Sequence, residues 1–267
     1  MTPFEKMILL GIPADYSWSD AGIVRLGESR DIAALSVGDF RGLCLIFCHG
    51  NGETAVSERY WFDKLSERGV SVICPDYRGY GLSSGTLSER GCYDAAHAAY
   101  EWLLNTKNIP ASRIAVLGYS LGSAVAVELA TSVPLVSMIL QTPFLGGAEL
   151  RPIWERRRGI SPLEEREKSF PTFERLPLVR VPTLVIHGMS DSIVPFEHGK
   201  AVFEHLASGN KKFIPVEGAD HCNFQYFLGE KYVPTLVEFM RRSGRYDFLK
   251  LPKTRFLSRW LRVFSRK

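Results

Sequence analysis

The sequence contains few cysteines and no long hydrophobic run. Its five cysteines include no C-x-x-C pair, which argues against a structural zinc site and against a disulfide framework. We expect buried free thiols instead. No apolar run reaches the roughly 18 residues that a membrane-spanning helix needs, and the short apolar run at 7–12 makes a poor secretory signal. We therefore expect a cytoplasmic protein.

Acidic charge is scarce at the C-terminal end, where basic charge is concentrated. Residues 241–267 carry ten lysines and arginines and one acidic residue, a net charge of +9, which leaves residues 1–240 at −5. The overall formal charge of +4 is therefore a property of the tail. Because the body is acidic and contains no recognition motif, we do not expect nucleic-acid binding.

Short apolar runs, many of them β-branched, alternate with amphipathic stretches along the chain. Six such runs stand out, and nearly all of them are apolar on both faces, as strands are when helices cover a parallel sheet on each side. They lie at 43–48, 70–74, 114–117, 136–140, 183–186 and 211–216. Helical patterns lie at 55–68, 88–106, 120–131, 197–207 and 224–242. The alternation predicts a doubly wound α/β domain, with two weaker runs at 23–27 and 32–37 as an antiparallel edge.

The segment 144–180 interrupts this alternation. It has no clear strand pattern but contains fourteen charged side chains and four prolines. Long insertions in a compact domain are usually functional or mobile, so we expect a cap over the carboxyl edge of the sheet. The predicted organisation is a single domain over 1–240, which includes this cap, followed by a basic amphipathic tail over 241–267.

Two serines lie in a G-x-S-x-G pattern, a common pattern that is weak on its own. A nucleophile elbow needs a strand that runs into the serine and a helix that leaves it. Ser120 meets this requirement, because an apolar strand precedes it and a helix of small residues follows. Ser83 lies several residues beyond its strand in a glycine-rich loop. We therefore assign Ser120 to chemistry and Ser83 to structure.

A serine nucleophile needs a base and a group that orients the base. His221 follows the last strand, at the sheet edge where Ser120 should lie. Of the other five histidines, three fall within helical patterns, and His49 and His187 end strands just before a glycine, where we expect them to shape the loop. Asp191 follows the preceding strand and is the predicted orienting acid. Asp220 is nearer in sequence, but the side chains of adjacent residues diverge, so it should point away from the imidazole.

The developing oxyanion needs hydrogen-bond donors, each contributing ~2.7–4 kcal/mol of transition-state stabilisation. One predicted donor is the backbone N–H of Leu121, at the start of a helix whose dipole favours negative charge. The other is the backbone N–H of Asn51, in the His-Gly-Asn-Gly loop after the first strong strand. A plain β-turn is the alternative interpretation of that loop.

Together these residues resemble the α/β-hydrolase superfamily, in which the triad follows the order Ser120, Asp191, His221. Three further stretches resemble recurrent loops of that family: 49–52, 76–85 and 187–195. The similarity covers roughly 40–240 and is greatest to small α/β-hydrolase-domain proteins that act on acyl esters and thioesters. It implies an α/β-hydrolase fold with a mostly parallel sheet, and the serine argues against relatives with an aspartate at the elbow. Segment 144–180 matches no one subfamily.

The resemblance implies a serine hydrolase that cleaves an ester or thioester of a small or lipid-like acyl substrate through an acyl-enzyme. This chemistry requires neither a metal nor an organic cofactor. A serine peptidase of the same fold, or a binding protein without turnover, is the alternative. The sequence does not determine the acyl length or the oligomeric state.

Residues 250–267 are a candidate membrane contact. On a helix from Thr254, four arginines share one face and five apolar side chains share the other. A basic face opposite an aromatic one is typical of helices that lie on a membrane surface. A terminal helix docked on the protein, or a frayed end, is the alternative, so peripheral membrane contact is one of two hypotheses for this segment.

Overall fold

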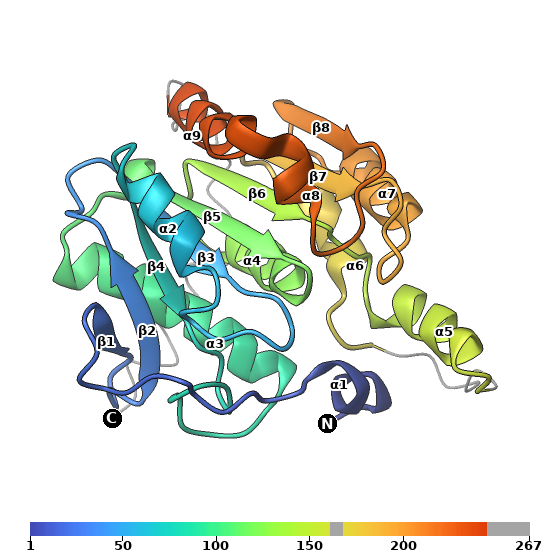
Figure 1. Ribbon diagram of the computed structural model, residues 1–267, viewed down its shortest axis with the longest axis horizontal. Helices are drawn as coiled ribbons and strands as arrows, with labels where there is room; N and C mark the ends of the chain where they lie inside the picture. The colour runs from blue at the N-terminus through green and yellow to red at the C-terminus, as the bar shows by residue number, and fades with distance from the viewer. Residues whose placement is uncertain (161–167, 245–267) are drawn as a thin grey trace.

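A computed structural model describes residues 1–160 and 168–244 and shows an eight-stranded sheet between layers of helices (Figure 1). The strands are β1 (Ile23–Leu26), β2 (Ile32–Val37), β3 (Leu43–Cys48), β4 (Val70–Pro75), β5 (Ile114–Tyr119), β6 (Ser137–Gln141), β7 (Thr183–Gly188) and β8 (Lys211–Val216). All six strong apolar runs and both weaker runs of the sequence form strands.

The sheet has the order β1-β2-β4-β3-β5-β6-β7-β8. Strands β3 to β8 pair in parallel, whereas β1 with β2 and β2 with β4 pair antiparallel. The predicted mostly parallel sheet and its antiparallel edge are therefore confirmed. Because the parallel strands all end at one edge, the loops that follow β3, β5, β7 and β8 meet there.

Helices cover both faces of the sheet, as a doubly wound fold requires (Figure 1). The α-helices are α1 (Pro3–Ile8), α2 (Arg59–Ser66), α3 (Glu89–Glu101), α4 (Leu121–Ser132), α5 (Gly147–Arg157), α6 (Thr172–Arg175), α7 (Phe196–His205), α8 (Phe224–Leu228) and α9 (Tyr232–Ser243). Helices α3, α4 and α7 contribute to the core on one face, and α2, α8 and α9 to the core on the other.

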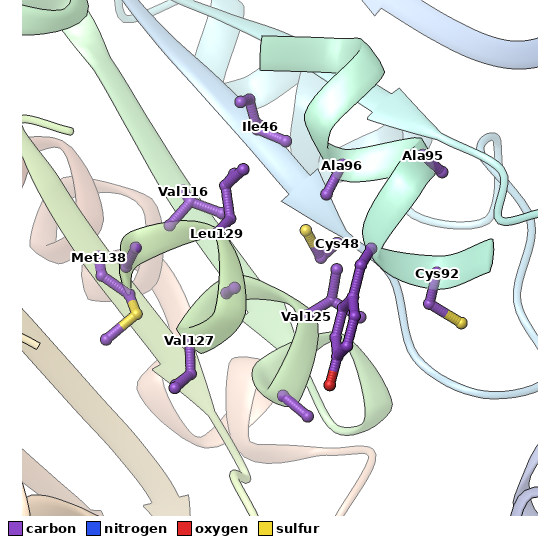
Figure 2. Close-up of a cluster of buried hydrophobic side chains, with 14 of the residues drawn as sticks. Ile46, Cys48, Cys92, Ala95, Ala96, Val116, Val125, Val127, Leu129 and Met138 are labelled. Carbon is purple, nitrogen blue, oxygen red and sulfur yellow. The ribbon is translucent and has the colours of Figure 1, made fainter. Parts of the chain in front are cut away.

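Successive residues of β3 point to opposite cores, because side chains alternate along a strand. Ile46 and Cys48 face α3 and α4 in the cluster of Figure 2. Phe47 belongs to the other core, where its ring lies 4.9 Å from that of Phe62 on α2. Each large apolar side chain buried in this way contributes about 1.5–3 kcal/mol. Small residues such as Ala96 on α3 let the helices pack closely.

The predicted helix over 224–242 is wrong as a single element. The structure divides it into α8, a 3₁₀ turn over Gly229–Lys231, and α9. Gly229 has a φ of +53°, which a helix cannot continue and which glycine adopts at little steric cost. The predicted helix over 88–106 is confirmed, although its last turn, Trp102–Thr106, is a π-helix.

The N-terminal helix α1 is short, and it was not predicted from the sequence. Thr2 and Glu5 form a capping box at its start. Its Phe4 is fully buried, with ring centroids 6.3 Å from Phe144 and 6.1 Å from Trp154. Because so short a helix is marginal alone, contacts of this kind must supply its stability.

The described parts of segment 144–180 contain α5, α6 and a 3₁₀ turn over Leu176–Leu178, and no strand. Helix α5 contacts the loop after β7: Trp154 Nε1 donates to the Ile193 carbonyl at 2.9 Å, and an Arg157 guanidinium nitrogen donates to the Ser192 carbonyl. Helix α5 therefore lies at the carboxyl edge of the sheet. The domain limits 1–240 and 241–267 stay a prediction.

Candidate active site

Ser120 lies at a sharp turn between a strand and a helix. Strand β5 ends at Tyr119 and helix α4 begins at Leu121, so one residue makes the connection. Ser120 has φ +51° and ψ −115°, a region that side-chain-bearing residues rarely adopt and that costs of order 1–3 kcal/mol. This is the geometry of a nucleophile elbow, which presents the serine oxygen above the sheet edge.

The two glycines of this turn are required by close backbone packing. A Cβ at Gly122 would lie 1.9 Å from the Cys48 carbonyl oxygen, and one at Gly118 would lie 2.2 Å from the Gly122 carbonyl oxygen. Such distances are far inside van der Waals contact, so only glycine lets α4 start this close to β3.

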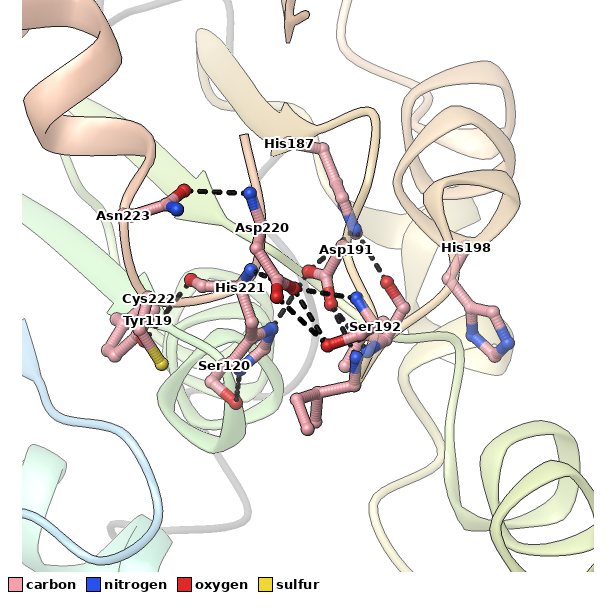
Figure 3. Close-up of polar contacts among 12 residues, drawn as sticks. Tyr119, Ser120, His187, Asp191, Ser192, His198, Asp220, His221, Cys222 and Asn223 are labelled. Atoms are coloured by element: carbon pink, nitrogen blue, oxygen red, sulfur yellow. Dashed lines mark hydrogen bonds and ion pairs between the residues drawn. The ribbon is translucent and has the colours of Figure 1, made fainter. Parts of the chain in front are cut away.

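The structure brings the three predicted side chains together (Figure 3). His221 Nε2 lies 2.9 Å from Ser120 Oγ, and His221 Nδ1 lies 2.8 Å from Asp191 Oδ2. Because a carboxylate only accepts hydrogen bonds, Nδ1 is the donor to Asp191. In an imidazole with one N–H, Nε2 then accepts the hydrogen bond from the Ser120 hydroxyl. The chain of contacts thus has the directions that a serine nucleophile with a general base requires.

Asp191 is held by more than His221. Its Oδ1 accepts the backbone N–H groups of Ile193 at 2.9 Å and Val194 at 2.7 Å. Its Oδ2 also lies 3.2 Å from His187 Nε2. Burial opposes ionisation, but the hydrogen bonds from His187 and His221 outweigh it and hold the pKa of Asp191 well below its usual range. The acid is therefore ionised and acts only as an acceptor.

His187 is a site residue that sequence reasoning missed. It ends β7 before a glycine, and the sequence assigned it only to shaping the loop. Its Nε2 donates to the Val194 carbonyl at 3.0 Å and reaches Asp191, so it both fixes the loop and supports the acid. The spacing His187-x-x-x-Asp191 was visible in the sequence, but only the folded loop turns the two side chains toward each other.

Asp220 points away from the imidazole, as the divergence of adjacent side chains predicts. Its carboxylate accepts hydrogen bonds from Ser192 and from the backbone N–H of His221 (Figure 3). The N–H groups of Ser192 and then His221 hold the pKa of Asp220 below its ordinary value. It has no contact with a His221 ring nitrogen among the hydrogen bonds of the described residues.

The predicted oxyanion donors lie at the start of helix α4, for Leu121, and on the loop after β3, for Asn51. Within 1–160 and 168–244, neither the Asn51 N–H nor the Leu121 N–H has a hydrogen-bond partner, so both donors are free. The Asn51 side chain is held elsewhere, because its Oδ1 accepts from the Leu10 N–H at 3.2 Å and from the Tyr80 hydroxyl at 3.0 Å. Their role as an oxyanion hole stays a prediction.

The remaining histidines have partners away from Ser120. His97 Nε2 lies 3.0 Å from Glu128 Oε2, and His205 Nδ1 lies 2.8 Å from a backbone carbonyl of its own helix. His198 accepts from the Leu145 N–H through Nδ1, and burial lowers its pKa to about 4. His49 is fully buried and stacks on Tyr77. His221 is thus the histidine that contacts Ser120 in the described chain.

Most of the cysteines are buried, as expected. Four cysteines are buried free thiols, but Cys222 is exposed, because it lies on the loop that carries His221 to the rim. In the described part of the chain, no three metal-ligating side chains gather, and no helix is long and apolar enough to cross a bilayer. The candidate membrane helix over 250–267 lies outside the described residues.

Comparisons with known proteins agree with this fold. A family model described as the alpha/beta hydrolase fold matches residues 44–143. An uncharacterised protein of Mycobacterium tuberculosis is 33% identical over 206 residues, which cover 76% of this chain and 71% of that protein.

Two animal relatives are longer than this chain. The alpha/beta hydrolase domain-containing protein aho-3 of Caenorhabditis elegans is 30% identical over 222 residues, 83% of this chain and 64% of its own length. The human alpha/beta hydrolase domain-containing protein 17C is 29% identical over 197 residues, 73% of this chain and 57% of its own. The matched region therefore spans less than two thirds of either animal protein.

Solved structures have the same fold at low identity. The Pyrococcus furiosus esterase Pf2001 superposes with a TM-score of 0.71 over 88% of this chain and 97% of that one, at 18% identity. The monoacylglycerol lipase of Paleococcus ferrophilus superposes with a TM-score of 0.61 over 79% of this chain and 99% of that one, also at 18% identity. Similarity at this level of identity concerns the fold alone.

Proposed function

The chain belongs to the α/β-hydrolase superfamily, and from this premise we propose that it is a serine hydrolase that cleaves ester or thioester bonds of acyl substrates. The observation that carries the proposal is the hydrogen-bonded chain from Ser120 through His221 to Asp191, which starts at a serine with a positive φ. A serine held in this strained conformation and hydrogen-bonded to a histidine has little structural purpose of its own.

The proposed reaction begins at the Ser120 oxygen. Ser120 Oγ attacks the acyl carbonyl carbon while His221 Nε2 takes the hydroxyl proton, and Asp191 stabilises the resulting imidazolium. The carbonyl oxygen becomes an oxyanion that accepts hydrogen bonds from the backbone N–H groups of Asn51 and Leu121. The tetrahedral intermediate then expels the alcohol or thiol, to which His221 returns the proton.

The second half of the reaction releases the acyl group. A water molecule gives one proton to His221 and its oxygen attacks the carbonyl carbon of the Ser120 ester. Collapse of the second tetrahedral intermediate breaks the bond to Ser120 Oγ, which takes the proton back from His221. The products are a carboxylic acid and the regenerated serine.

A fluorophosphonate activity probe tests this proposal. The wild-type chain should be labelled covalently, Ser120→Ala should not, and Ser83→Ala should be labelled like the wild type. Hydrolysis of p-nitrophenyl acyl esters, acyl thioesters and aminoacyl anilides then separates an esterase or thioesterase from a peptidase. A folded wild-type chain that is not labelled and hydrolyses none of these substrates would contradict the proposal and favour a binding protein on this fold.

A further inference from the structure

The loops that carry Asp191 and His221 are joined by hydrogen bonds across the carboxyl edge of the sheet. Near the strands the joins are between backbone groups: the Met189 N–H donates to the Val216 carbonyl and the Ser190 N–H donates to the Ala219 carbonyl, both at 2.9 Å. This ladder ends at Ser190, one residue before the acid.

Beyond that point the Asp220 side chain continues the connection (Figure 3). Its Oδ1 accepts the backbone N–H of Ser192 at 2.7 Å and the backbone N–H of His221, also at 2.7 Å. The Ser192 hydroxyl adds contacts of 2.9 Å to Oδ1 and 3.0 Å to Oδ2. One carboxylate oxygen therefore binds the amide of the base itself and the amide of the residue that follows the acid.

The backbone of Asp220 is also fixed by a hydrogen bond. The Asp220 N–H donates to Asn223 Oδ1 at 2.7 Å, in the turn that leads into α8. Among the described residues, the links between the two loops beyond Ser190 are those of the Asp220 carboxylate and the His221–Asp191 hydrogen bond.

We propose that Asp220 is a positioning residue that sets the separation of the acid and the base by clamping their two loops through one carboxylate. The inference rests on the proposed hydrolase function for its kinetic consequence. Asp220 does not touch the imidazole nitrogens or the serine oxygen, so it acts through the main chain at Ser192 and His221. Charged acceptors make shorter and stronger hydrogen bonds than neutral ones, which suits a carboxylate to this task.

The expected consequence is a loss of turnover and not of substrate binding. A displacement of about 1 Å between catalytic groups costs roughly 100-fold in rate. Asp220→Ala should therefore lower kcat by about 10- to 100-fold and change KM by no more than about threefold. Asp220→Asn keeps an acceptor oxygen at the same place and should retain kcat within about fivefold of the wild type.

The test uses the full chain, with kcat and KM measured on a p-nitrophenyl ester and folding checked by circular dichroism. Glu217→Gln is the matched control, because Glu217 is an exposed acid on the same loop. Ser192→Ala removes only the hydroxyl contacts, and it should lower kcat less than Asp220→Ala does and add nothing when the two are combined. If Asp220→Ala does not fold, Ser192→Ala should still lower kcat below that of Glu217→Gln, and equal kcat values in these two variants would contradict the clamp.

A low-field proton NMR resonance gives a readout that does not depend on turnover. The proton between His221 Nδ1 and Asp191 should give such a signal in the wild type, in Glu217→Gln and in Asp220→Asn, and the signal should broaden or disappear in Asp220→Ala. Wild-type kcat in Asp220→Ala, an unchanged resonance in it, or equal losses in Asp220→Ala and Asp220→Asn would overturn the clamp. A wild type without hydrolysis or probe labelling would instead refute the proposed function, and the resonance would still test the clamp.

Discussion

Ser120 and Ser83 occupy the centre of the same five-residue pattern, and the fold uses them in opposite ways. Ser120 has a positive φ and its hydroxyl contacts His221 across 101 residues of sequence. Ser83 is buried, donates to the Asp76 carbonyl at 2.9 Å and accepts the Ala33 N–H at 2.9 Å. The pattern specifies a local turn, whereas the elements on either side decide whether the serine is free to react.

Glycines that flank the two serines should differ most in their tolerance of substitution. Gly122→Ala would place a Cβ against the backbone of β3, and we expect it to lower the free energy of unfolding by roughly 3 kcal/mol or more. A Cβ at position 85 would meet only the flexible Arg78 side chain, at 3.3 Å. The φ of +103° at this position should make Gly85→Ala lower the free energy of unfolding by about 1–2 kcal/mol.

Urea unfolding followed by tryptophan fluorescence measures both glycine variants under the same conditions. If Gly122→Ala proved as stable as Gly85→Ala, the close approach of α4 to β3 would not be the reason for glycine at the elbow.

Two acidic side chains on the loops that follow β3 and β4, Glu53 and Asp76, are also held differently. Asp76 accepts hydrogen bonds from the backbone N–H groups of Ala55 and Leu82 and from the Tyr16 hydroxyl. Glu53 accepts the Gly50 N–H at 2.7 Å. Burial, with the nearby Glu58 carboxylate, raises the pKa of Glu53 to about 8.

This difference predicts a pH effect for Glu53→Gln. The unfolded chain ionises Glu53 above its ordinary pKa, whereas the folded chain keeps it protonated until about pH 8, so the wild type loses stability between those values. Glutamine cannot ionise, and its oxygen can still accept the Gly50 N–H. The stability of Glu53→Gln relative to the wild type should therefore rise by roughly 3 kcal/mol from pH 5 to pH 8.

Denaturant unfolding at several pH values measures this difference, with the exposed Glu101→Gln as the control for removal of an acidic charge. A difference between Glu53→Gln and the wild type that stays constant from pH 5 to pH 8 would mean that Glu53 is already ionised in the fold.

Much of the fold was predictable because buried parallel strands are apolar on both faces, a signal that survives without any knowledge of contacts. Most of strands β3 to β8 were found this way, whereas β1 and β2 were predicted from weaker runs as an antiparallel edge. The order in which Ser120, Asp191 and His221 follow their strands located the candidate site. Helix α1 was missed because its stability comes from Phe4 packing on distant residues, and the break at Gly229 depends on a single left-handed residue.

The supporting contacts of the site were less accessible than its central residues. His187 and Asp220 were each considered in the sequence, one as a loop-shaping residue and one as a rejected acid. His187 contacts Asp191 within the loop after β7, and the Asp220 carboxylate joins that loop to the His221 loop. No local pattern encodes which way such side chains turn. Positions at strand ends can be predicted from sequence, whereas the hydrogen bonds between loops require the folded structure.

Replacing each serine by alanine should separate stability from activity. Ser83→Ala leaves the buried Ala33 N–H without its acceptor and should cost about 1–2 kcal/mol of unfolding free energy while kcat stays near that of the wild type. Ser120→Ala should abolish hydrolysis but change stability by less than about 0.5 kcal/mol. Parallel measurement of urea midpoints and ester hydrolysis checks both, and loss of activity in a folded Ser83→Ala would reverse the assignment of the two serines.

Replacing each of these alanines by glycine should give the smallest effects on stability, and the sign of the effect should differ between positions 120 and 83. At position 120 the φ of +51° suits glycine, so Ser120→Gly should be more stable than Ser120→Ala by about 1 kcal/mol. Ser83 is not among the described residues with a positive φ, so Ser83→Gly should be less stable than Ser83→Ala by roughly 0.5–1 kcal/mol. Thermal unfolding of the two alanine and the two glycine variants resolves differences of this size. Two differences of the same sign would show that the strained backbone at Ser120 is relieved in the absence of its hydroxyl, and that the bond to His221 holds the elbow in place.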